Sequence, residues 1–145
     1  MGHTVRQKKV LARFCTLSNE DITNTKMTEA QWTSKYMDLI PDGVWEVKLA
    51  GKKRNTISYK QFAPHQIRKL LQAKHGRIKI KMRDVGKHQK EFDGISLTKS
   101  PAWAVLVFGS IAYVLDIDAF YNFCMREGNK VISVQDSMKL GYRIL

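Results

Sequence analysis

The sequence predicts an α/β (α+β) fold in which a mixed sheet is flanked by helices. Helical segments with recognisable capping residues alternate with short segments in which apolar and polar residues alternate as in strands. One run, 102–108, is apolar on both faces, which predicts a central strand covered on both sides. The chain has 145 residues and is 43% hydrophobic, so it is long enough and apolar enough for one domain with its own core.

The first predicted helix has clear start and stop signals. Thr28 and Gln31 form a capping box, and Met27 with Trp32 forms a hydrophobic staple around it. The turn sequence Pro41-Asp42-Gly43 ends the helix. The segment 44–49 then alternates apolar and polar residues, which predicts a strand.

The middle of the chain is predicted to contain a second helix and two strands. We expect residues 57–62 to be extended. Pro64 stands at the first position of a helix that Gly76 ends. Strands are predicted at 77–82, with its apolar residues facing inward, and at 92–97.

The last part of the chain begins with the apolar strand 102–108. A tight hairpin at Gly109-Ser110 joins it to a strand at 111–117. Asp118 is predicted to cap a helix that ends near Gly128, and edge strands are predicted at 131–134 and 142–145.

The charge balance indicates a polyanionic partner. There are 25 Lys and Arg residues against 13 Asp and Glu, which gives a formal net charge of +12, so nucleic acid is the leading candidate. No apolar run approaches the ~20 residues of a membrane span, and no signal peptide is visible. The two cysteines form neither a disulfide framework nor a zinc motif, so a cytoplasmic location is expected. We expect a basic N-terminal arm at 1–25 and a core domain at 26–145.

Glu46 and Lys48 form the first candidate site. Because they are two residues apart on a predicted strand, their side chains share a face, while Trp45, Val47 and Leu49 point the other way. A carboxylate can hold a divalent cation, and a neighbouring lysine can orient water or neutralise charge on a phosphate. The simpler interpretation is an ion pair on a solvated strand face.

The order of elements and motifs resembles the PD-(D/E)XK nuclease superfamily, and more closely the small Holliday-junction-resolvase-like endonucleases of phages. The resemblance runs from about residue 29 to 134. The matching residues are Trp45-Glu46-Val47-Lys48, Phe62-Ala63-Pro64-His65-Gln66-Ile67 with Leu70 and Leu71, Lys81, Asp84, Lys90-Glu91-Phe92-Asp93-Gly94, Pro101-Ala102-Trp103-Ala104-Val105 and Tyr113-Val114-Leu115-Asp116-Ile117-Asp118.

This resemblance implies a restriction-endonuclease-like fold and hydrolysis of DNA phosphodiesters that depends on Mg²⁺ (or Mn²⁺). Glu46 would bind the metal, and Lys48 would act at the phosphate. Gln66 would be the glutamine of the second helix that faces such sites, and Glu29 could match an acid of the first helix. The DNA would be branched, the protein would act as a homodimer, and a phage-encoded copy would work in the host cytoplasm.

The chain departs from the family pattern at the aspartate, which usually lies on the strand before Glu-x-Lys. Asp93 is the preferred replacement, because it begins a strand that we expect beside the strand of Glu46. Asp84, Asp42 and Asp38 are the alternatives.

Many basic residues are candidates for contact with DNA phosphates. A solvated charged face is the alternative for each of them. A non-catalytic DNA-binding or RNA-binding module is the alternative function. The nucleic-acid-binding candidates are Lys52, Lys53, Arg54, Arg68, Lys81, Arg83 and Lys90.

Overall fold

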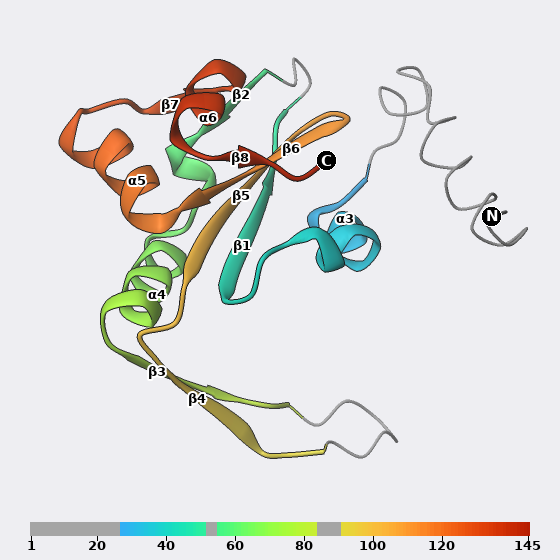
Figure 1. Cartoon of the computed structure of the whole chain (residues 1–145), viewed down its shortest axis with the longest axis vertical. Coiled ribbons are helices and arrows are strands. Elements are labelled where there is room, and N and C mark those ends of the chain that lie inside the picture. Colours follow the sequence, from blue (N-terminus) through green and yellow to red (C-terminus); the bar gives the residue numbers. More distant parts are fainter. Residues whose placement is uncertain (1–26, 52–54, 84–90) are drawn as a thin grey trace, which may run out of the picture.

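The structure, a computed structural model, describes residues 27–51, 55–83 and 91–145 (Figure 1). Its centre is a mixed sheet with the strand order β1-β5-β6-β8. Strand β1 (Val44–Leu49) runs parallel to β5 (Ala102–Phe108), and β5 pairs antiparallel with β6 (Ile111–Asp116). The short strand β8 (Tyr142–Arg143) closes the other edge. The predicted mixed sheet and its central strand 102–108 are therefore confirmed.

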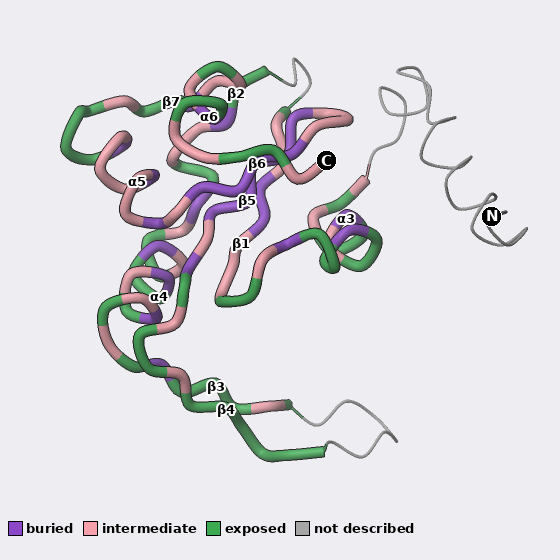
Figure 2. Tube along the Cα trace, viewed as in Figure 1, coloured by how far each residue is buried: buried purple, intermediate pink, exposed green. Residues whose placement is uncertain are grey.

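Strand β5 separates two hydrophobic cores, because successive side chains point to opposite faces. Ala104 and Leu106 belong to one core, and Val105 and Val107 belong to the other. Figure 2 shows buried residues concentrated along β5 and β6, with a short buried stretch in β1. The layers on the two faces come from helices that are far apart in sequence.

Helix α4 (Pro64–His75) and helix α5 (Ile117–Tyr121) cover the first core, while α3 (Glu29–Tyr36) covers the second (Figure 1). A π-helical turn, Asn122–Arg126, continues α5. Two helix starts predicted from sequence are confirmed, since α3 has its capping box and α4 has proline in its first turn. The predicted cap at Asp118 is wrong, because Asp116 is the N-cap of α5 and Asp118 lies in its first turn.

The capping box of α3 is reciprocal. The Gln31 backbone N–H donates to Thr28 Oγ1 at 3.2 Å, and the Thr28 N–H donates to Gln31 Oε1 at 2.9 Å. A 3₁₀ turn, Met37–Leu39, follows the helix before Pro41. The N-terminus of α3 lies beside β1, where Glu29 is 3.5 Å from Lys48 Nζ.

A hairpin of β3 (Arg77–Lys81) and β4 (Gly94–Thr98) forms a separate two-stranded sheet that extends away from the central sheet (Figure 1). Two expectations fail here. Strand β4 pairs with β3 and is not a neighbour of β1, and Ile80 is 42% exposed instead of facing a core. Only Ile78, at the base of the hairpin, is buried as predicted.

The remaining elements cover the end of the sheet opposite this hairpin. Strand β2 (Thr56–Ser58) pairs with β7 (Val131–Ser133), and the 3₁₀ turn Tyr59–Gln61 replaces the rest of the predicted extended segment. Helix α6 (Val134–Leu140) was not predicted. Among the described residues, no helix combines the length and the apolar character needed to cross a membrane.

Candidate active site

Glu46 and Lys48 lie on β1, the edge strand of the central sheet, with their side chains on the same side. Val47, between them, belongs to the opposite core, as the alternation predicted. Lys48 is only 6% exposed, whereas the Glu46 side chain is 27% exposed, so the lysine is buried beside a carboxylate that solvent can reach. Because β1 is an edge strand, side chains from α3 and from β1 itself reach this buried ammonium group.

The Lys48 ammonium group lies between two carboxylates. Its Nζ atom is 3.0 Å from Glu46 Oε1 and 3.5 Å from Oε2 of Glu29, at the start of α3. It also lies 5.7 Å from the centre of the Phe62 ring. A buried cation is costly unless charged groups compensate it, so the two acids explain how this lysine is tolerated. The structure thus brings together Glu29, Glu46 and Lys48, as the resemblance implied.

Gln66 joins this cluster from the first turn of α4. Its Oε1 atom accepts a hydrogen bond from the Ala63 backbone N–H at 2.9 Å, which fixes the orientation of the amide. Its Nε2 atom then donates to Glu46 Oε1 at 2.7 Å. The residue that caps the helix therefore also holds the carboxylate, and its predicted place facing the site agrees with the geometry.

The donor set fits a divalent cation of the magnesium type. Glu29 and Glu46 supply carboxylate oxygens that lie within 3.5 Å of the same lysine nitrogen. Their side chains are 44% and 27% exposed, so water and a phosphate can reach them. Mg²⁺ commonly binds through one or two carboxylates and completes its shell with water and substrate phosphate.

Asp93 does not lie where the sequence predicted it. It directly precedes β4 on the projecting hairpin, and its carbonyl oxygen accepts a hydrogen bond from the Met82 backbone N–H at 2.8 Å. The expectation failed because it assumed that β4 neighbours β1, whereas β4 pairs only with β3 in the described sheets. Within the described residues, no group of three or more His, Cys, Asp or Glu side chains could hold a metal ion.

The alternative aspartates have different positions. Asp38 is exposed on the 3₁₀ turn after α3. Asp42 is exposed just before β1, where its carbonyl oxygen accepts a hydrogen bond from Trp103 Nε1 at 3.0 Å. Asp84 lies outside the described residues. Glu29, a weaker candidate than Asp93 on sequence grounds, is the acid that shares Lys48 with Glu46.

The predicted nucleic-acid-binding residues fall into two groups. Arg68 on α4, Lys81 at the end of β3 and Arg83 just beyond it are all exposed. Lys52, Lys53, Arg54 and Lys90 lie outside the described residues. The exposed members remain available for contact with phosphate.

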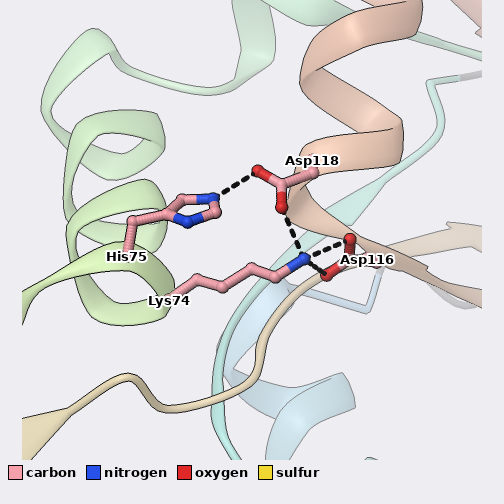
Figure 3. Close-up of polar contacts among 4 residues, drawn as sticks. All are labelled: Lys74, His75, Asp116 and Asp118. Atoms are coloured by element: carbon pink, nitrogen blue, oxygen red, sulfur yellow. Dashed lines mark hydrogen bonds and ion pairs between the residues drawn. The ribbon is translucent and has the colours of Figure 1, made fainter.

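A second polar cluster, absent from the sequence predictions, joins the end of α4 to the junction of β6 and α5 (Figure 3). Lys74 Nζ donates to both oxygens of Asp116, at 2.8 and 2.6 Å, and lies 2.5 Å from Asp118 Oδ2. His75 Nε2 lies 2.7 Å from Asp118 Oδ1. These contacts connect residues more than forty positions apart, so no local sequence pattern indicates them.

The charges of this cluster stabilise one another. Burial tends to raise the pKa of Asp118, but hydrogen bonds from His75 and Lys74 outweigh it, so the pKa is lowered. Burial tends to lower the pKa of Lys74, but its hydrogen bonds to Asp116 and Asp118 outweigh it, so the pKa is raised. Each shift favours the charged form, as expected for an ion-pair cluster that holds two elements together.

Comparisons of this chain with protein-family models, with curated proteins and with solved structures found no match.

Proposed function

We propose that the protein is a Mg²⁺-dependent (or Mn²⁺-dependent), structure-selective DNA endonuclease that cuts Holliday junctions or related branched DNA. One observation carries the proposal. The Lys48 ammonium group lies between the carboxylates of Glu29 and Glu46, and Gln66 orients the carboxylate of Glu46. Three separate elements contribute these four side chains, for which the family resemblance implies roles at a metal and a phosphate.

Each of the four side chains would have a separate role in cleavage. Glu29 and Glu46 would hold the cation, which when bound polarises a phosphoryl oxygen and lowers the pKa of a bound water. Lys48 would neutralise negative charge that develops on the phosphate, and its burial makes that interaction stronger than in water. Gln66 would keep Glu46 in position through its second hydrogen bond to the Ala63 backbone.

The rest of the molecule supports DNA as the substrate. The formal net charge of +12 favours a polyanion, and a mixed sheet flanked by helices agrees with a restriction-endonuclease-like fold. Two symmetric cuts in a junction need two active sites, so we propose a homodimer. The host cytoplasm would be its place of action if a phage encodes it.

Nicking of a labelled four-way junction and of its linear duplex arms tests the proposal. The wild type should cut the junction with Mg²⁺ and should not cut it in the presence of a chelator. Glu46→Gln keeps the shape of the side chain but removes the charge, so cutting should fall while DNA binding persists. Glu127→Gln, the same change at an exposed acid on the turn after α5, is the matched control and should leave cutting unchanged.

A non-catalytic DNA-binding module is the second candidate. Among the described residues, two acids lie at Lys48, but no cluster of three metal ligands is present. This favours binding without catalysis. Binding of the junction without cutting under any divalent cation would select this candidate. Undiminished cutting by Glu46→Gln would instead show that the active site is not at Glu46.

A further inference from the structure

The β3–β4 hairpin has two chemically different faces. The register pairs Ile78 with Leu97 and Ile80 with Ile95 on one face. These apolar pairs hold the two strands together, which a two-stranded ribbon needs because it is marginally stable by itself. The other face carries the cations of β3 and the hydroxyl groups of β4.

The cationic face bears Arg77, Lys79 and Lys81, all exposed, opposite Thr98, Ser96 and Gly94. Neither strand contains an acidic residue. Asp93 directly precedes β4, where its carbonyl oxygen accepts a hydrogen bond from the Met82 N–H. One face of the ribbon therefore presents cations and hydroxyl groups without an acid among its strand residues.

The base of the ribbon is fixed to the body of the protein. The Ser100 N–H donates to the Ala73 carbonyl and the Lys99 N–H donates to the Gly76 carbonyl, at 2.8 and 2.9 Å. Ile78 is buried against the core beneath α4. Beyond this base, the ribbon extends away from the sheet and is largely exposed (Figures 1 and 2).

We infer that the β3–β4 ribbon is a binding arm for duplex DNA, with the face of Arg77, Lys79 and Lys81 against the phosphate backbone at the major groove. The major groove is about 12 Å wide and admits a two-stranded ribbon. Alternate strand residues are about 6.7 Å apart, which is about the axial rise of two nucleotides on one DNA strand. Successive cations on β3 would therefore match every second phosphate of one DNA strand.

This arm is distinct from the cluster around Lys48. The inference rests on the proposed DNA partner but not on cleavage, because the ribbon contributes none of the side chains at Lys48 in the described contacts. The ribbon would hold one duplex arm of a branched substrate while another part of the substrate reaches the sheet edge. Binding and cutting can therefore be measured separately.

The experiment measures duplex DNA affinity as a function of salt, by fluorescence anisotropy without divalent cations. The test variant is Lys79→Ala with Lys81→Ala. The control is Lys130→Ala with Lys139→Ala, which removes two exposed cations beside β7 and on α6, at the other end of the molecule (Figure 1). Circular dichroism and thermal melting should show both variants folded.

Each DNA phosphate that the protein no longer neutralises lowers the slope of log K against log salt by about 0.9 in magnitude, so the slope of the test variant should fall by about 1.8. Its affinity deficit should therefore narrow about tenfold between 50 and 200 mM salt, and the control should keep the wild-type slope. An unchanged slope in the test variant, or an equal decrease in both variants, would overturn the inference. A larger decrease on duplex RNA than on duplex DNA would overturn it too, and would assign the ribbon to RNA.

The outcomes for cleavage are separate. If the wild type never cuts DNA but the ribbon variant shows the reduced slope, the binding arm stands and the nuclease proposal fails. If the wild type cuts and the ribbon variant keeps the wild-type slope, the nuclease proposal stands and the binding arm is wrong.

Discussion

Lys48 is a buried lysine that, in the proposed nuclease, would also act at the phosphate. It is 6% exposed, which is costly for an ammonium group, and Glu29 and Glu46 lie close enough to compensate its charge. The same two carboxylates are the ones that we propose as ligands for a divalent cation. Folding therefore places a cation, two acids and an orienting amide at one edge of the sheet, before any substrate binds.

Replacing Lys48 with methionine should slow cutting strongly with little effect on DNA binding. Methionine fills a similar volume, but it carries no charge, so it loses the cation–π contact with Phe62 and cannot neutralise charge on the phosphate. Removing one preorganised donor of this kind typically lowers the catalytic rate by about 10²–10³-fold. Single-turnover cutting of a saturated junction measures the rate, with Lys139→Met on exposed α6 as control. A rate within about threefold of the wild type would show that Lys48 has only a structural role.

Metal binding should depend on Glu29 and Glu46 but not on Asp93. A ligand that binds only the folded state at a hundredfold excess over its Kd adds about 2.7 kcal/mol of stability. Mn²⁺ should therefore raise the melting temperature of the wild type and of Asp93→Asn. It should have little effect on Glu29→Gln or Glu46→Gln. If Asp93→Asn alone fails to respond to Mn²⁺, the metal site is on the hairpin and the assignment to the sheet edge is wrong.

The elements that sequence predicted well are those with local signals. The capping box at Thr28, the proline and glycine that bound α4, and the apolar run of β5 each act within a few residues. Helix α6 was missed although Ser133 and Asp136 form its capping box, which is a recognisable start signal for a short helix. Long-range placement could not be predicted, since alternation in β3 does not show whether a core faces the apolar side.

The contact between α4 and α5 should make stability sensitive to acid through Asp118. Its pKa is lowered in the folded state, so its contribution to stability is present above the unfolded pKa and is lost as pH falls through the folded pKa. Asp118→Asn should therefore destabilise the protein most at neutral pH, and its deficit should shrink below about pH 4. Urea unfolding of both proteins from pH 7 to pH 3 measures this. A deficit that is constant with pH would show that the ion pairs of Asp118 contribute nothing.

Gly94 should be essential for the shape of the β3–β4 hairpin. A Cβ atom at this position would lie 2.6 Å from the Ile80 carbonyl oxygen, closer than such contacts normally occur. Gly94→Ala should therefore distort the pairing at the outer end of the ribbon and weaken duplex binding, while the global melting temperature changes little. Hydrogen exchange at β3 and β4 would detect the distortion. Gly51→Ala, where no atom lies within 4 Å of the added Cβ, is the control.

At the scale of the whole molecule, acidic and basic groups have different environments. Four of the acids that the structure describes, Glu29, Glu46, Asp116 and Asp118, neutralise lysines inside clusters. The cations of the ribbon and Arg68 are instead exposed. The excess of positive charge is therefore available at the surface, where it can attract a polyanion over distances up to about 10 Å at 0.1 M salt.

The basic segment 1–25 should contribute to this attraction as well. It lies outside the described residues, and its Arg6, Lys8, Lys9 and Arg13 are the basis for predicting that it contacts DNA. Deleting it should lower the salt slope of duplex binding by about 0.9 for each phosphate that the segment neutralises. Full-length protein with these four residues changed to glutamine should show the same decrease, which separates charge from chain length. If both proteins keep the wild-type slope, the segment does not touch DNA, and binding depends on the cations of the core and the ribbon.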